Sequence, residues 1–171
     1  FPGALVSMGS ATLVSDGPRD GKFAIAAEVY NKAGELGRKA GVQVAVHPSS
    51  HHNTLLFDRA DYDAIFALLD PDLVGWVPDT GHILRGHKDM ADTLTTYRDR
   101  IRYIHLKDVD ASGTWAMLGE GVCDTPQVIE IADTAPHFNG WLVLEEESDT
   151  AAADPAAAVK TNRQTMRGYG A

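Results

Sequence analysis

Four polar residues recur at wide intervals along the chain, and their side chains are of the types that bind metal ions or move protons. They are His47, Asp79, His105 and Glu145. The intervals are 32, 26 and 40 residues, each about the length of one strand followed by one helix. Two imidazoles and two carboxylates form a mixed nitrogen and oxygen set that suits Mn²⁺, Co²⁺, Mg²⁺ or Zn²⁺. The pattern predicts one divalent metal site, if the fold brings the four residues together.

Such a site could support proton transfer. Removing a proton next to a carbonyl leaves negative charge on adjacent oxygens, and a divalent cation stabilises that charge. Glu145 could both bind the metal and take the proton. Lys107 lies two residues after His105, so on a strand it points to the same side. There Lys107 could neutralise an oxyanion or donate a proton.

Two further histidines are candidates for contact with a substrate. His82 lies three residues after Asp79. It could face the substrate, or it could hydrogen-bond a metal ligand from behind. His51 follows His47 after a Pro-Ser-Ser segment and could also replace it as a metal ligand.

The elements that must position these residues alternate between strand and helix. Short apolar runs predict strands at 4–8, 42–46, 73–77, 101–106 and 140–144. Apolar spacings of three and four residues, with caps and prolines, predict helices at 22–40, 59–69, 89–99, 125–134 and 155–168. No Asn-Gly hairpin signal separates the strands, so the pattern indicates an α/β protein with a parallel sheet.

Two architectures fit this alternation. The length of 171 residues favours a doubly wound sheet, because a complete (β/α)8 barrel needs at least about 200 residues. The polar residues favour a barrel, because all strand ends of a barrel converge on one mouth, whereas those of an open sheet are spread along an edge. The unit length and the converging strand ends favour a curved parallel sheet of five strands, ordered as in the sequence.

Composition excludes several classes of protein. The net charge is −9 and the isoelectric point is near 5.1, which argues against a nucleic-acid partner. No apolar run approaches the roughly 20 residues that a membrane span needs. Cys123 is the single cysteine, so we expect no internal disulfide and a cytoplasmic setting. The chain begins at Phe1 without a signal-peptide pattern, and we expect one domain, 1–171, that is a piece of a longer protein.

An ordered set of motifs resembles a known family. The motifs are D-T-G-H at 79–82, H-L-K-D-V at 105–109, G-E-G at 119–121 and W-L-V-L-E at 141–145. Together they resemble the xylose isomerase-like barrel family of sugar phosphate isomerases and epimerases, with its inosose dehydratase branch. The resemblance spans about 41–147. It implies a partial (β/α)8 barrel of about five units, which corresponds to strands four to eight of the complete barrel.

The resemblance also implies a set of metal ligands. The family commonly binds one divalent metal through Glu, Asp, His and Glu from successive strands, and Asp79, His105 and Glu145 fall on three of these positions. His47 departs from the pattern, because many epimerases have Glu there. The dehydratase-like branch has a histidine-containing version at this point.

The leading functional hypothesis is a metal-dependent isomerase or epimerase that acts on a sugar, sugar phosphate or related ketone through an enediolate. The runner-up is a lyase that dehydrates a keto-inositol by the same first step. An apurinic DNA endonuclease of similar fold would need a basic groove, which the charge disfavours. A non-catalytic barrel fragment is the remaining alternative. The small-molecule substrate would then be a sugar or an inositol derivative, and open sheet edges would favour a homo-oligomer.

Overall fold

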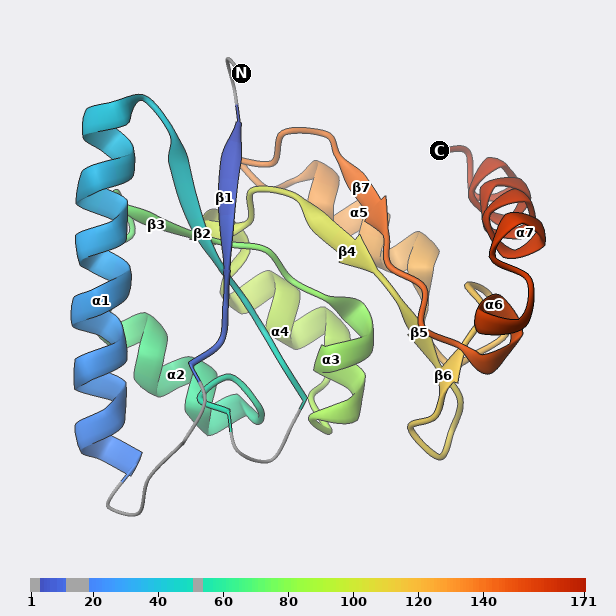
Figure 1. Cartoon of the computed structure of the whole chain (residues 1–171), viewed down its shortest axis with the longest axis horizontal. Coiled ribbons are helices and arrows are strands. Elements are labelled where there is room, and N and C mark those ends of the chain that lie inside the picture. Colours follow the sequence, from blue (N-terminus) through green and yellow to red (C-terminus); the bar gives the residue numbers. More distant parts are fainter. Residues whose placement is uncertain (1–3, 12–18, 51–53) are drawn as a thin grey trace.

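Five parallel strands lie in the order in which they occur along the chain (Figure 1). The structure is a computed structural model that describes residues 4–11, 19–50 and 54–171. The strands are β1 (Leu5–Gly9), β2 (Gln43–His47), β3 (Val74–Trp76), β4 (Ile104–Leu106) and β7 (Leu142–Leu144). Strands β1, β2 and β3 form one sheet, and β4 pairs with β7. Two isolated parallel bridges, Trp76 to Ile101 and Asp79 to His105, join the two groups.

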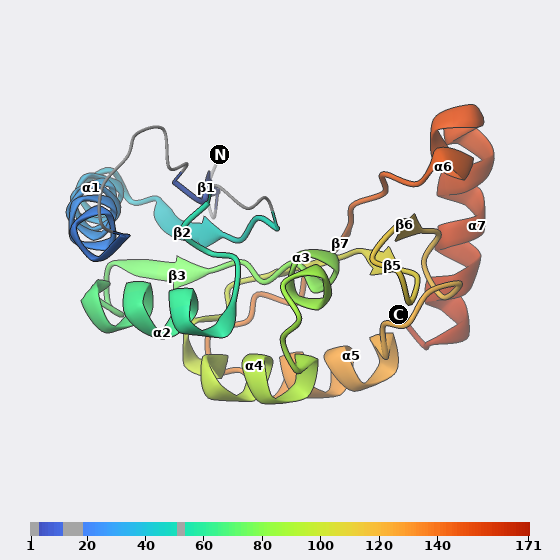
Figure 2. The same cartoon turned by 90° about the horizontal axis from the view of Figure 1, so that it is seen from below.

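The long helices lie outside the strands. They are α1 (Arg19–Ala40), α2 (Arg59–Leu68), α4 (Met90–Thr96), α5 (Thr125–Asp133) and α7 (Pro155–Gly168). Figure 2 shows them as an arc around one side of the strands. A doubly wound sheet would instead carry helices on both faces and reverse its strand order. The arrangement confirms the expected partial barrel and rules out the doubly wound alternative that chain length favoured.

An aromatic cluster holds β3 against the helices. The rings of Tyr62, Phe66, Trp76 and Tyr97 lie with their centroids 4.7 to 6.0 Å apart. Trp76 is fully buried, and burial of such a side chain contributes roughly 1.5–3 kcal/mol. Since β3 leads directly into the loop that carries Asp79, this packing fixes the position of a predicted metal ligand.

Several short elements were not expected from the sequence. They are α3 (Thr80–Arg85), the 3-10 helix η1 (Arg98–Arg100), the antiparallel pair β5 (Asp108–Val109) and β6 (Trp115–Ala116), and α6 (Asp149–Ala153). β5 and β6 form a short hairpin apart from the five parallel strands, although no Asn-Gly signal marks it. The turn between β5 and β6 has Gly113 at φ +84°, and the Asp110 carboxylate accepts hydrogen bonds from the backbone N–H groups of Ser112 and Thr114. A short polar turn of this kind carries no Asn-Gly signature.

The two ends of the array of strands are unpaired within the described residues. β1 pairs only with β2, and β7 pairs only with β4. Among the residues that the structure describes, no helix combines the length and the apolar character needed to cross a membrane.

Two glycines allow α1 to lie close to the rest of the molecule. A Cβ atom at Gly34 would lie 2.8 Å from the carbonyl oxygen of Leu73, and one at Gly37 would lie 2.7 Å from that of Val42. Gly21, near the start of the same helix, has no atom within 4 Å of an added Cβ. Packing therefore requires glycine at two positions of the helix, 34 and 37, and does not require it at position 21.

We predict opposite effects of alanine at these positions. Gly34→Ala forces backbone apart and should lower the free energy of unfolding by roughly 1–3 kcal/mol. Gly21→Ala meets no obstacle and should raise it by up to about 1 kcal/mol through helix propensity. Urea denaturation of both variants checks the pair, and equal stabilities would contradict the packing argument.

Candidate metal centre

Backbone hydrogen bonds between neighbouring strands hold the predicted ligands in register. The N–H of Val77 donates to the carbonyl of Val46, next to His47, at 2.9 Å. The N–H of His105 donates to the carbonyl of Pro78, next to Asp79, at 2.9 Å. In the same way the N–H of Glu145 donates to the carbonyl of Leu106 at 3.0 Å. The four ends of β2, β3, β4 and β7 are therefore neighbours in space.

The structure brings the four predicted metal ligands together. One nitrogen or oxygen of each side chain lies within 4.8 Å of those of the other three. His47 Nε2 lies 3.0 Å from His105 Nδ1, 3.7 Å from Asp79 Oδ2 and 3.8 Å from Glu145 Oε2. His105 Nδ1 also hydrogen-bonds Glu145 Oε2 and lies 3.9 Å from Asp79 Oδ2. Donor atoms spaced in this way could share one cation.

The burial and hydrogen bonding of the Asp79 carboxylate suit a cation bound between the four side chains. Its side chain is 0% exposed. Oδ1 accepts a hydrogen bond from the N–H of His82 at 2.8 Å, which caps helix α3. Oδ2 is buried and makes no hydrogen bond with any residue that the structure describes. Burial raises the pKa of Asp79 to about 6. An orphaned carboxylate oxygen facing two imidazoles and a second carboxylate is suited to hold a divalent metal.

The protonation states of the other donors also suit a metal. Burial, together with the neighbouring His105, lowers the pKa of His47 to about 4, so its imidazole is neutral near pH 7 and keeps a free lone pair. The hydrogen bond from His105, with help from Lys107, outweighs burial and holds the pKa of Glu145 well below its usual range. A cation bound here would displace the proton that His105 and Glu145 share.

Lys107 lies on the same side of the site as His105. Its Nζ donates to Glu145 Oε1 at 2.8 Å and lies 2.7 Å from Glu147 Oε2. The ammonium also lies 4.2 Å from the centre of the Trp115 ring, which is a cation–π distance. Burial opposes the charge, but the two carboxylates raise the pKa of Lys107 above its ordinary value. Lys107 is therefore a buried, protonated donor beside Glu145.

The two histidines predicted to contact a substrate have different outcomes. His51 lies outside the described residues. His82 is buried, and its Nδ1 accepts a hydrogen bond from the N–H of Ser50 at 3.1 Å. Burial and the charge of Lys107 lower its pKa to about 3. A neutral ring that accepts at Nδ1 carries its proton on Nε2, so His82 has a donor left for another partner.

Sequence reasoning missed two contributors to the site. Glu147, which was not among the predicted site residues, is half exposed and pairs with Lys107. The signal was its position two residues after Glu145, which places both on one side of an extended chain. Asp108 is the other. Its buried carboxylate accepts hydrogen bonds from the N–H groups of Gly119, Gly121 and Cys123. These hydrogen bonds hold the G-E-G segment beside Asp108.

Comparisons with known proteins agree with this geometry. The family described as xylose isomerase-like TIM barrel matches residues 3–169. An inosose dehydratase from Geobacillus thermodenitrificans is 30% identical over 155 residues, which cover 80% of this chain and 51% of that protein. The chain spans about half the length of the curated relatives it matches.

Solved structures share the fold at low identity. The IOLI protein with a binding zinc atom superimposes with a TM-score of 0.79 at 14% identity, covering 97% of this chain and 62% of that chain. L-ribulose 3-epimerase gives a TM-score of 0.66 at 19% identity, covering 99% and 65%. The fold, the motifs and the family match lead to one conclusion. The chain belongs to the xylose isomerase-like TIM barrel family.

Proposed function

We propose that this chain carries the metal centre of an enzyme that removes a proton next to the carbonyl of a sugar or polyol ketone. The observation that carries the proposal is Asp79 Oδ2, a buried carboxylate oxygen without a hydrogen-bond partner among the described residues, surrounded by His47, His105 and Glu145. The nearby Lys107 adds a proton donor to this centre.

His47, Asp79, His105 and Glu145 would hold one divalent ion, Mn²⁺, Co²⁺, Mg²⁺ or Zn²⁺. When bound, the ion would polarise the substrate carbonyl, make the neighbouring proton more acidic and offset charge that builds on the oxygens. The zinc in the IOLI structure supports this assignment by analogy of fold. A metal is thus the first requirement of the proposal.

Glu145 is the group best placed to accept the proton. Its side chain is 30% exposed, whereas that of Asp79 is fully buried, so Glu145 is the more accessible of the two carboxylates. The depressed pKa keeps Glu145 ionised near neutral pH but makes it a weak base. Proton removal therefore depends on a substrate whose acidity has been raised.

Lys107 supplies the acid. Because its pKa is raised, Lys107 is protonated when the substrate arrives. Its ammonium would stabilise the oxyanion next to the reacting carbon, or protonate a hydroxyl that leaves. His82 would donate from Nε2 to another substrate oxygen and fix its orientation.

Two reactions share this first step. An isomerase or epimerase returns the proton to carbon, and a lyase expels a hydroxyl from the next carbon. An epimerase that works with two carboxylates needs one on each face of the substrate, whereas the end of β2 provides the imidazole of His47 instead. This substitution, and the likeness to inosose dehydratases, support the lyase as the second candidate beside the isomerase.

Solvent exchange tests the shared step. The purified chain, loaded with Mn²⁺ or Co²⁺, is incubated in D2O with a keto-inositol and with a panel of ketoses, and NMR follows the protons next to the carbonyl. We expect metal-dependent exchange. Exchange with isomerised product indicates the isomerase, and loss of water indicates the lyase. Tight metal binding without exchange in any substrate would refute the proposal and favour the non-catalytic fragment.

Asp79→Asn should weaken metal binding by at least about tenfold, the lower end for residues that only orient a ligand. Asparagine keeps an oxygen that can cap α3 but removes the charge. Asp89→Asn is the matched control, because Asp89 caps α4 in the same way, at an exposed position. Calorimetric titration with Zn²⁺ and Mn²⁺ measures both variants, and equal affinities would exclude Asp79 as a ligand.

Lys107→Met should lower turnover by a factor of about 100–1000, as expected when one electrostatic contact to a transition state is lost, while metal remains bound. Lys160→Met, at an exposed position on α7, is the control. Rates at saturating substrate and the metal content are measured together. An unchanged rate would exclude the role, and loss of metal with activity would make Lys107 a positioning residue.

A further inference from the structure

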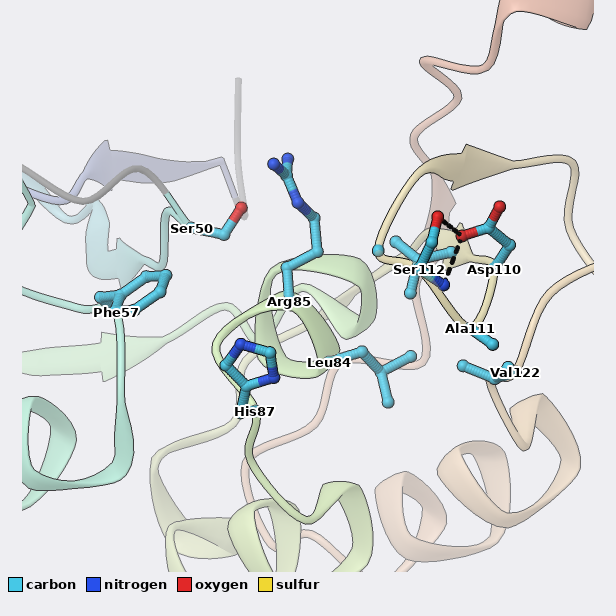
Figure 3. Close-up of a pocket in the computed structure, with 11 residues that line it drawn as sticks. Ser50, Phe57, Leu84, Arg85, His87, Asp110, Ala111, Ser112 and Val122 are labelled. Carbon is cyan, nitrogen blue, oxygen red and sulfur yellow. Dashed lines mark hydrogen bonds between the residues drawn. The ribbon is translucent and has the colours of Figure 1, made fainter.

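A cavity of about 310 Å³ lies beside the candidate metal centre. Its walls come from four parts of the chain, as Figure 3 shows: Ser50 and Phe57 after β2, then Leu84, Arg85 and His87 at the end of α3, then β5 with the turn that follows it, and Val122. We call it the Arg85 cavity, because the guanidinium of that residue points between Ser50 and the Ser112 turn (Figure 3). None of the four candidate metal ligands lines it.

One aromatic side chain connects the Arg85 cavity to the metal centre. The Trp115 ring has the Arg85 guanidinium carbon 4.4 Å from its centre and the Lys107 ammonium 4.2 Å from its centre. The ring also packs edge-on against His82, with centroids 5.3 Å apart. Ser50, on the cavity wall, hydrogen-bonds His82 Nδ1 through both its N–H and its hydroxyl group. The cavity and the metal centre are thus separated by single side chains.

Arg85 has donors to spare. No carboxylate of the described residues lies within ion-pair distance of it, although the chain has nine more acidic than basic residues. Asp110 also lines the cavity, and its Oδ1 accepts hydrogen bonds within its own turn, from Ser112 Oγ at 2.6 Å and from two backbone N–H groups. Stacking on Trp115 holds the guanidinium in place without using its N–H groups in the ring plane.

A planar guanidinium with free N–H groups binds carboxylate and phosphate oxygens in pairs. The imidazole of His87 lies on the same cavity and offers a further donor, whereas the Ser50 hydroxyl proton is donated to His82 Nδ1 (Figure 3). A volume of 310 Å³ is at the small end of ligand pockets, which suits one charged group and a few carbons. The lining therefore matches an oxyanionic group, and an apolar ligand would leave Arg85 without a partner.

We propose that Arg85 binds an oxyanionic substituent of the substrate, a phosphate ester or a carboxylate, while the carbonyl end lies at the metal centre. The inference rests on the proposed function for the identity of the substrate. It makes Arg85 a specificity residue, which selects a charged keto sugar over a neutral one. The Trp115 ring, which lies between Arg85 and Lys107, would then separate the two ends of the bound substrate.

The first experiment needs no turnover. Metal-free ¹⁵N-labelled chain is titrated with inorganic phosphate and, separately, with acetate, so that phosphate and carboxylate recognition are told apart. We expect saturable shifts of the Gly113 amide and the Trp115 indole N–H. Arg85→Gln should weaken this binding by about 10- to 100-fold, as for hydrogen bonds to charged groups. Arg167→Gln, which removes the same charge from an exposed position on α7, should leave it unchanged.

The second experiment separates this inference from the proposed function. For a keto sugar acid or keto sugar phosphate that exchanges its proton, Arg85→Gln should raise KM by about 10- to 100-fold with little change in kcat, and leave a neutral ketose unaffected. Anion binding at Arg85 without any proton exchange would overturn the function but keep the anion site. The inference would be overturned by proton exchange that does not prefer charged substrates, together with NMR shifts on anion addition that are equal in Arg85→Gln and Arg167→Gln. The NMR spectrum of Arg85→Gln verifies that this variant folds. Arg85→Lys keeps the charge but loses the paired donors, so its anion affinity should lie between those of the native chain and Arg85→Gln.

Discussion

A fully buried carboxylate is costly unless both oxygens find partners, and Asp79 has one partner within the fold. Oδ1 caps helix α3 and Oδ2 has no partner among the described residues. The cap fixes the direction of the side chain, so Oδ2 must face His47 and His105. Aromatic packing around Trp76 and the hydrogen bond from His105 to Pro78 hold the loop in place. The arrangement of strands and helices thus presents one carboxylate oxygen without a hydrogen-bond partner to the centre of the site.

Lys107 brings an opposite charge to the same place. It is 2% exposed, and its two carboxylate partners, Glu145 and Glu147, come from the chain that follows β7. Trp115 and Gly81 close the space around it, since a Cβ at Gly81 would lie 2.9 Å from Lys107 Cγ and 2.8 Å from the Trp115 ring. A buried ammonium held between carboxylates stays charged and immobile. The site therefore has an ordered acid before any ligand enters.

Much of this could be predicted from the sequence, for a physical reason. Parallel strands in a barrel end at one mouth. A His or an acidic residue after each strand can therefore be predicted to lie near the others, and its type indicates the chemistry. This places His47, Asp79, His105 and Glu145 in one group without knowledge of any contact. Arg85 and Glu147 could not be identified in the same way. Their roles depend on which way α3 and the chain after β7 turn, and Trp115 packs against Arg85 and Lys107 from a hairpin that lacks a recognisable turn sequence.

Strand β7 lies at the end of the array and its three residues are only half-buried. Leu142 and Leu144 pack against the core from one side, and the side chain of Glu145, directly after the strand, reaches the candidate metal centre. A cation held by both His47 and Glu145 would join residues 98 positions apart. Such a link restricts the unfolded chain much as a disulfide that closes a long loop does, and it stabilises only the folded state. Bound metal would then hold β7 in place. The concentration of metal would set the rate at which proteases cleave this end of the protein.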